Sequence, residues 1–417
     1  MLFAPLLLVL SPAVAQQADF SLPISRVPIS RVPGRTPRLG QAAGPDGINV
    51  FNSQQYTYNV KCGFGEPPQY LDLVLDTGSS DCWVCSDSCQ DADCRAVPCF
   101  KPPASNSLID TRDPFNLEYL SGQVHGTICY DSLWLGSFKI LNQAFAVALK
   151  TAELGLASSM TSGIIGLGFP ASAAIPPPAG GTILDNIMAA RPPNERFFAF
   201  HLPRESGLSD PTASFTVGRL DPQIVNDSSL IQTMDVVPTG THYDYWKISM
   251  KRLTCNGVPF SISSSRILHA PSPIAVLDSG TTLILGPSAD VAAFYDQCGG
   301  GRARYTREAG YQLPCKLALK VCFVLGNAEY CLDPADVSWD EAADGDYCLG
   351  GLQANDRVNA ADWLLGDTFL RNVYVVHYYS AQPQIGLLGL TDFDAALEAF
   401  RHQRGSDLDD GGGRRDG

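Results

Sequence analysis

Basic residues are scarce in this sequence of 417 residues. Lys and Arg number 29 against 43 Asp and Glu, which gives a formal net charge of −14 at pH 7 and a sequence pI near 4.8. A chain so short of positive charge is not expected to bind nucleic acid, or to be held on an anionic membrane by a basic surface. Acidic surfaces suit proteins that work at low pH, but they are also common in neutral cytosolic enzymes, so the charge alone decides little.

Long apolar runs are also rare. Residues 2–10 form one, and no later segment is apolar over the roughly 20 residues that a membrane span requires. Residues 13–15 (AVA) add the small-x-small pattern of a signal-peptidase site, so we predict a signal peptide over residues 1–15. No Lys or Arg precedes the run, and a membrane anchor is the alternative, although the run is too short to cross a bilayer. We expect a mature form without a membrane span, secreted or extracellular, or in an acidic compartment such as a vacuole or cell wall.

The cysteine content agrees with export. Thirteen cysteines suit an oxidising compartment where most are paired, and the odd number leaves at least one unpaired. Asn226 begins an Asn-x-Ser sequon, which export would make available for glycosylation. Five cysteines are closely spaced, and they suggest either zinc or disulfides; no His lies among them, so we favour disulfides and expect no metal: Cys82, Cys85, Cys89, Cys94 and Cys99.

Long helical periods are absent from most of the chain. From about residue 51, short runs of β-branched and aromatic residues are broken by Gly, Pro, Asn and Asp, which predicts a mainly β protein. Residues 16–44 differ, because they are rich in Pro and Arg and repeat the pentapeptide PISRV. We expect this segment to be extended and to serve as a propeptide that lies across an acidic cleft; a disordered linker is the alternative.

An internal duplication predicts two lobes. Residues 73–80 (LVLDTGSS) recur as residues 275–282 (AVLDSGTT), in each case an apolar strand followed by Asp, a hydroxyl residue and Gly. Residues 163–168 (GIIGLG) and 363–367 (WLLGD) form a second repeat, a pair of bulky aliphatic residues before Gly. We therefore divide the chain into an N-terminal lobe (45–235), a C-terminal lobe (236–395) and a polar tail (396–417).

The two copies resemble the active-site signatures of pepsin-like aspartic proteases. The resemblance extends from about residue 50 to 392 and includes residues 65–69 (GEPPQ), 245–248 (YWKI) and 365–371 (LGDTFLR). It implies a bilobal, mainly β fold with the active-site cleft between two related lobes.

The resemblance also implies catalytic roles. Asp76 and Asp278 would form the dyad, because two adjacent carboxyl groups cannot both ionise and so share one proton. One would act as base and the other as acid on a water molecule and the scissile carbonyl. The hydroxyl residues would orient the carboxyl groups, although they could instead only satisfy local backbone; the implied supporting residues are Ser79, Thr281, Gly78 and Gly280.

A hairpin of the first lobe would form a flap over the cleft. Tyr119 lies where the family has its flap tyrosine, and its phenol could bond Trp83. Ser121 and Gly122 follow it as further substrate-binding candidates. Leu120 departs from the family pattern, because a small residue is usual at this position. An ordinary core tyrosine is the alternative for Tyr119.

Two further features follow from the resemblance. Cys315 and Cys348 match the positions of a family disulfide, and Cys322 with Cys331 could close a hairpin. Residues 375–378 (VVHY) lack the aspartate that often follows this strand, which would alter the electrostatics of the dyad and the pH optimum.

These observations predict a secreted aspartic endopeptidase, made as a zymogen, with an acid pH optimum. It would act on protein or peptide substrates, need no cofactor and be monomeric. A non-catalytic pepsin-like binding or inhibitor protein is the alternative, which intact Asp76 and Asp278 disfavour. A glycosidase with two carboxylates is disfavoured by the duplication.

Overall fold

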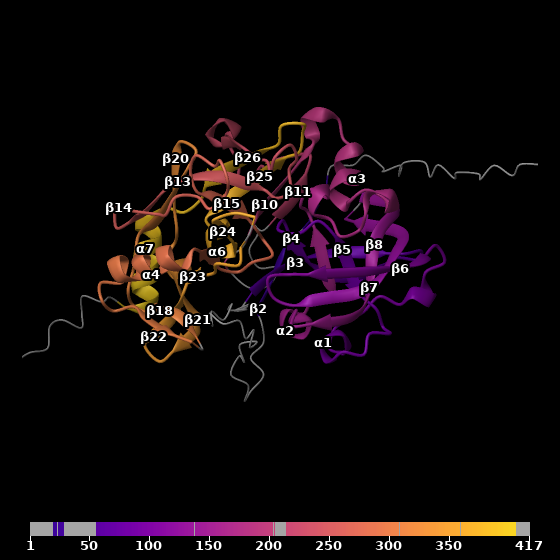
Figure 1. The fold of residues 1–417 in the computed structure, drawn as a ribbon, viewed down its shortest axis with the longest axis horizontal. Coiled ribbons are helices and arrows are strands. Elements are labelled where there is room, and N and C mark those ends of the chain that lie inside the picture. The colour runs from indigo at the N-terminus through magenta and orange to yellow at the C-terminus, as the bar shows by residue number, and fades with distance from the viewer. Residues whose placement is uncertain are drawn as a thin grey trace, which may run out of the picture.

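The computed structural model describes residues 20–22, 24–28, 56–136, 138–202, 204, 214–307, 309–358 and 360–405. The expected signal peptide and most of the expected propeptide lie outside these residues. In the described part the chain is mainly β, as predicted, and its strands form four sheets. Figure 1 shows the N-terminal lobe (indigo to magenta) beside the C-terminal lobe (orange to yellow). None of the helices described is long and apolar enough to cross a membrane.

The N-terminal lobe is built on an eight-stranded sheet. Strands β4 and β9 pair in parallel inside this sheet, and β6, β7 and β8 form long hairpins. In spatial order the strands are β2 (Ser25–Pro28), β3 (Tyr56–Phe64), β4 (Gln69–Asp76), β9 (Gly163–Gly166), β5 (Cys82–Cys85), β8 (Phe138–Ala152), β7 (Gln123–Leu135) and β6 (Ile109–Glu118).

The C-terminal lobe repeats this plan in a second eight-stranded sheet. Its strands are β20 (Ala328–Cys331), β19 (Val321–Leu325), β13 (Lys247–Cys255), β15 (Ile274–Leu277), β24 (Trp363–Leu365), β16 (Ile284–Gly286) and β23 (Leu352–Ala354), with β14 (Val258–Phe260) on β13. A four-stranded sheet beside it contains β17 (Arg304–Thr306), β18 (Gly310–Pro314), β22 (Tyr347–Gly350) and β21 (Ser338–Asp344).

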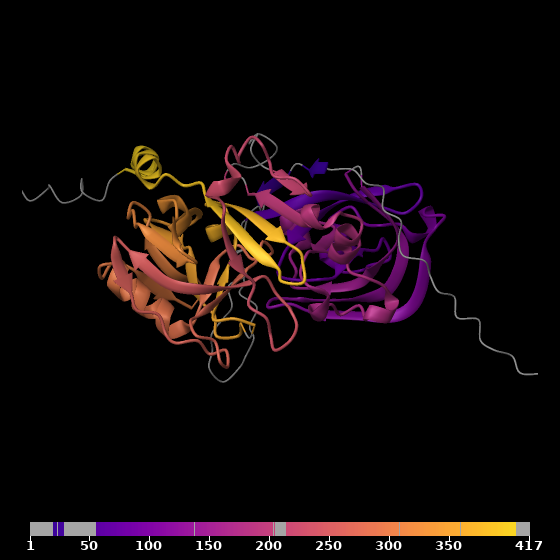
Figure 2. The ribbon, with the colours of Figure 1, turned by 90° about the horizontal axis from the view of Figure 1, so that it is seen from above.

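A six-stranded sheet joins the two halves of the chain. Its strands are β1 (Phe20–Leu22), β11 (Ser214–Val217), β10 (Phe197–His201), β25 (Val373–Tyr378), β26 (Gln384–Gly389) and β12 (Gln232–Asp235). Figure 2 shows β25 and β26, in yellow, lying between the lobes beside the magenta strands. β1 and β2 come from the segment expected to be a propeptide; both are extended, and Ile24 between them is fully buried.

The described helices are short, from 4 to 12 residues. They are α1 (Ala92–Arg95), α2 (Leu156–Ser159), α3 (Ile183–Ala189), α4 (Ser288–Cys298), α5 (Pro334–Val337), α6 (Asp367–Leu370) and α7 (Phe393–Arg404). Single 3₁₀ turns occur at Pro102–Ala104, Pro170–Ser172, Pro177–Ala179, Pro193–Glu195 and Ser228–Leu230. α7 includes the first part of the segment expected to be a polar tail, and it buries Phe400.

The duplicated motifs are paired strands in space. β4 lies parallel to β9, with Leu75 beside Ile165, and β15 lies parallel to β24, with Leu277 beside Leu365. All four residues of β15 are buried, as expected of a strand whose two faces are covered. Each lobe thus places the end of one buried strand, and the residue that follows, at the boundary between the lobes.

Candidate active site

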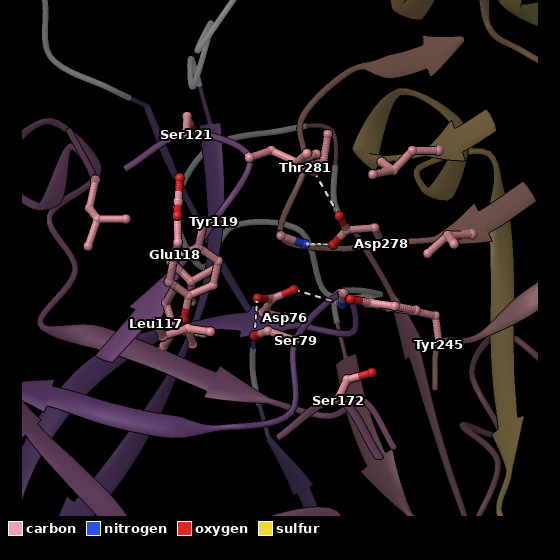
Figure 3. A pocket seen from close by; sticks show the side chains of 18 of the residues that line it. Asp76, Ser79, Leu117, Glu118, Tyr119, Ser121, Ser172, Tyr245, Asp278 and Thr281 are labelled. Atoms are coloured by element: carbon pink, nitrogen blue, oxygen red, sulfur yellow. Dashed lines mark hydrogen bonds between the residues drawn. The ribbon is translucent and has the colours of Figure 1, made fainter. Parts of the chain in front are cut away.

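The two motif aspartates come from equivalent places in the two lobes. Asp76 is the last residue of β4, and Asp278 directly follows β15. The backbone at each is held by the partner strand, since the Leu167 amide donates to the Asp76 carbonyl (2.7 Å) and the Asp278 amide donates to the Leu365 carbonyl (3.1 Å). The strand ends therefore fix both carboxyl groups, and Figure 3 shows the two side chains facing each other.

Each carboxyl group accepts the same two hydrogen bonds from its own loop. The amide of Gly78 donates to Asp76 Oδ1 (2.8 Å) and the hydroxyl of Ser79 donates to Oδ2 (2.5 Å). In the other lobe the amide of Gly280 donates to Asp278 Oδ1 (2.8 Å), and the Thr281 hydroxyl donates to its Oδ2 (2.7 Å). The structure thus brings the predicted supporting residues into contact with the predicted pair.

The glycines of the two motifs allow the carboxyl groups to approach. A Cβ atom on Gly78 would overlap with the carboxyl group of Asp278, and a Cβ atom on Gly280 would overlap with that of Asp76. Each glycine therefore lies against the carboxyl group of the opposite lobe. No other residue type fits at either position without separating the pair.

The environment favours protonation of the pair. Asp76 is only 5% exposed and Asp278 only 7%. Burial raises the pKa of both carboxyl groups, and the charge of Asp278 raises that of Asp76 further. Because the two groups interact strongly, they titrate as a unit and hold one proton over a wide pH range.

The hydroxyl residues next to the aspartates link the lobes. The Thr77 hydroxyl donates to the carbonyl of Leu277 (2.9 Å) and accepts from the Ser279 amide (3.1 Å). In return, the Ser279 hydroxyl donates to the carbonyl of Leu75 (2.7 Å) and accepts from the Thr77 amide (3.1 Å). No separate role was predicted for Thr77 or Ser279. The signal was present, because a hydroxyl residue occupies this position in both copies.

A hairpin covers the pair. Strands β6 and β7 meet at residues 119–122, where the Tyr119 amide donates to the Gly122 carbonyl (3.0 Å). The indole of Trp83 donates to the Tyr119 hydroxyl (2.8 Å), as expected, and Figure 3 places Tyr119 and Ser121 near the aspartates. Burial raises the pKa of Tyr119, so its hydroxyl stays protonated. Gly122 has a positive φ of 87°, which favours glycine in this turn.

A pocket of about 710 Å³ contains the pair. Residues of both lobes line it, and Figure 3 shows the flap residues on one side and Tyr245 with Ser172 on another. Four ionisable residues line it besides Asp76, Asp278 and the tyrosines: Asp81, Glu118, Asp356 and Arg357. A ligand bound in this pocket would contact both lobes and a mixed polar and apolar lining.

Asp81 is a third buried carboxyl group among the residues that line the pocket, and it was not predicted. It is 3% exposed and accepts from the amides of Ala174 (2.7 Å) and Ile175 (2.9 Å). Burial raises its pKa. These hydrogen bonds tie the first signature to the segment that follows the 3₁₀ turn at Pro170–Ser172. The Ser172 hydroxyl of that turn donates to the Asp244 carbonyl (2.9 Å) of the second lobe.

Disulfides occupy most of the cysteine-rich segment. Four of its five cysteines form the Cys85–Cys99 and Cys89–Cys94 bonds, while Cys82 is buried and free. In the C-terminal lobe the disulfides are Cys315–Cys348 and Cys322–Cys331.

Comparison with known proteins agrees with this geometry. Residues 55–389 match the eukaryotic aspartyl protease family. Human napsin-A is 30% identical over 91% of this chain and 86% of its own length, and guinea-pig (Cavia porcellus) cathepsin E is 28% identical over 81% of each. A fungal relative, major aspartyl peptidase 1 of Cryptococcus neoformans, is 29% identical over 78% of this chain and 67% of its own length. The chain therefore belongs to the pepsin family of eukaryotic aspartyl proteases and is an aspartic-type endopeptidase.

Proposed function

We propose that Asp76 and Asp278 are the catalytic dyad and that the protein is a secreted, acid-active enzyme made as a zymogen. The main observation that supports this dyad is the position of Gly78 and Gly280. Each would collide with the opposite carboxyl group if it had a side chain, so both loops keep the carboxyl groups adjacent.

The reaction follows from one proton shared by two buried carboxyl groups. The ionised carboxylate accepts a proton from a water molecule, whose oxygen forms a bond with the scissile carbonyl carbon. The protonated carboxyl group donates its proton to the carbonyl oxygen, which yields a neutral tetrahedral diol. When the C–N bond breaks, the protonated carboxyl group donates its proton to the amine nitrogen, and the ionised one accepts a proton from one hydroxyl of the diol. The products are a carboxylic acid and an amine, and the dyad again holds one proton. No covalent enzyme intermediate forms.

Ser79 and Thr281 act as positioning residues in this scheme. Their hydroxyls donate to the Oδ2 atoms and so hold the carboxyl planes in the orientation that the shared proton requires. Tyr119, Ser121 and Gly122 cover the substrate, with Trp83 holding the tyrosine, and exclude bulk water from the reacting bond.

Hydrolysis of acid-denatured haemoglobin between pH 2 and 7 tests the dyad. Activity in acid should be abolished by Asp76→Asn, by Asp278→Asn and by pepstatin, an inhibitor of aspartic proteases. Ser80→Ala serves as a loop control because its hydroxyl bonds the Phe169 carbonyl rather than a carboxyl group of the pair. Full activity in either Asn variant would exclude that residue from the chemistry.

The zymogen proposal concerns residues 16–44. The basic composition of this segment complements the carboxylates that line the pocket, and protonation of those carboxylates in acid weakens the attraction. Acid incubation followed by N-terminal sequencing tests it. An active form that starts near residue 45 supports a propeptide, whereas one that retains residues 20–28 assigns β1 and β2 to the mature enzyme.

Export and glycosylation have a shared test. Asn226 is exposed, in the loop that follows β11, and its sequon is therefore accessible. We expect the protein in the medium of a eukaryotic host, with a mass that falls on N-glycosidase treatment. Asn226→Gln should remove that mass shift, and size-exclusion chromatography of the same material should give a monomer.

A further inference from the structure

The flap contains a residue that packs against the opposite lobe. Leu120 follows Tyr119 at the turn between β6 and β7 and is partly buried. Tyr119 packs against an apolar cluster of the N-terminal lobe that includes Trp83, Val124 and Leu156. Leu120 instead packs against an apolar cluster of the C-terminal lobe. Tyr119 and Leu120, adjacent in one hairpin, thus contact the N-terminal and the C-terminal lobe respectively.

The cluster that receives Leu120 forms part of the pocket wall. Three of its buried members line the pocket: Val276, Val358 and Leu364. Tyr245, which also packs on this cluster, lines the pocket too. Val276 lies two residues before Asp278 on β15, so this apolar wall is adjacent to the reacting groups. We call these four residues the C-lobe wall.

Leu120 therefore occupies apolar space that a substrate side chain would otherwise fill. Tyr119 and Leu120 lie in the turn that follows β6, where their side chains contact different lobes. A small residue at position 120 would leave the C-lobe wall open to the substrate. The methylene and methyl groups of a leucine side chain at this position fill part of the free space beside Asp278.

We propose that Leu120 is a specificity-determining residue that narrows the apolar subsite at the C-lobe wall. The enzyme then prefers a small side chain at one of the two substrate positions that flank the scissile bond. The other flanking position, which contacts the N-terminal lobe, still accepts a bulky residue. This inference rests on the proposed function of Asp76 and Asp278.

Two peptide series test the inference. In each, one residue flanking the scissile bond is Ala, Leu or Phe and the rest of the peptide is constant. For the wild type, kcat/KM should fall as the varied side chain becomes larger in one series, and it should not fall in the other. Leu120→Ala should raise the Phe/Ala ratio of kcat/KM at least about tenfold in the restricted series alone, because even one methylene in such a pocket changes discrimination about tenfold or more.

Controls separate pocket volume from flap damage. Leu120→Met conserves volume and should retain the wild-type ratio. Leu141→Ala makes the same truncation at a residue of β8 that is 39% exposed and outside the pocket, and it should leave both series unchanged. Equal shifts in both series for Leu120→Ala would indicate a loosened flap and overturn the inference, as would an unchanged ratio.

Binding provides a readout that does not depend on catalysis. The same two series, made with a non-cleavable hydroxyethylene group in place of the scissile amide, are titrated against Asp76→Asn protein with and without Leu120→Ala. The Kd ratio of the Phe and Ala peptides should shift at least about tenfold in one series. If the wild type hydrolyses no peptide but this shift occurs, the dyad proposal fails and the assignment of Leu120 stands. An unchanged Kd ratio overturns the assignment of Leu120.

Discussion

His377 provides the sharpest prediction about stability in acid. It lies on β25 in the sheet that joins the lobes, is fully buried, and neither ring nitrogen has a hydrogen-bond partner among the described residues. Its ring stacks on Phe198 (4.4 Å between centroids) and Phe200 (5.5 Å) and meets Trp246 edge-on (4.7 Å). Burial lowers the pKa of His377 from 6.5 to about 3. The folded protein therefore keeps this ring neutral in mild acid.

The direction of the pH effect follows from that difference. Below about pH 6.5 the unfolded chain protonates His377 while the folded protein does not, so the free energy of unfolding falls as the pH falls. The loss grows until the folded pKa is reached near pH 3. At about 1.4 kcal/mol per pH unit it amounts to about 3 kcal/mol at pH 4, and to about 5 kcal/mol in full. This is a large fraction of the stability of a typical protein.

The substitution His377→Phe should remove this loss. Urea unfolding of the Asp76→Asn protein, which cannot digest itself if the dyad proposal holds, would be followed at pH 7.5 and pH 4 with and without the change. At pH 7.5 the substitution should raise the free energy of unfolding by about 1–3 kcal/mol, because two ring nitrogens without hydrogen-bond partners are removed from the core. At pH 4 the gain should be larger by about 3 kcal/mol.

An exposed histidine supplies the control. His402 lies on α7 in contact with solvent, and His402→Gln should change stability by the same small amount at both pH values. Equal gains for His377→Phe at pH 7.5 and pH 4 would refute the argument, because they would show that the ring takes up its proton in the folded state as readily as in the unfolded one.

Three other substitutions test separate contacts. Thr77→Val should lower the free energy of unfolding by about 2–6 kcal/mol in urea, since two buried backbone groups lose their cross-lobe partner; a loss below about 1 kcal/mol would contradict this. Arg371→Met should cost about 1–3 kcal/mol in the same assay because Oδ1 of the fully buried Asp336 loses its partner while Arg204 still pairs with Oδ2, and an unchanged midpoint would argue against the Arg371 contact. Tyr119→Phe should reduce kcat/KM about 2–10-fold without a change in Tm, because the flap loses its hydrogen bond to Trp83; a matching loss of Tm would indicate a structural role instead.

Much of the fold could be predicted because the apolar strands are short and are separated by Gly, Pro, Asn and Asp. The short runs of β-branched and aromatic residues predicted a mainly β protein, and such runs form strands at Ser214–Val217, Ile274–Leu277 and Val373–Tyr378. Both aspartates were found because the duplication places each after a buried strand. The helix α7 was not predicted although its signal is present, since Phe393, Leu397 and Phe400 follow one another at helical spacing.

Other features depend on contacts between distant segments. The cross-lobe hydrogen bonds of Thr77 form only when the loops after the two motif strands lie against each other in one relative position. No local sequence pattern specifies that position. Cys82 stays unpaired for a similar reason. On β5 its side chain packs in the main core while that of Cys85 packs in a second cluster, and only the latter meets Cys99. The contact of Leu120 with the C-terminal lobe likewise needs the closed hairpin.

The sheet between the lobes also affects how the protein folds during synthesis. β10 pairs with β25, which lies far later in the chain and leaves the ribosome long after β10. Until then, one edge of Phe197–His201 has backbone donors and acceptors without their final partners and carries apolar side chains. The N-terminal half therefore keeps an unpaired strand edge, and can pair with other chains, until β25 has been synthesised. A truncation that stops before Val373 should accordingly aggregate rather than yield a free N-terminal lobe.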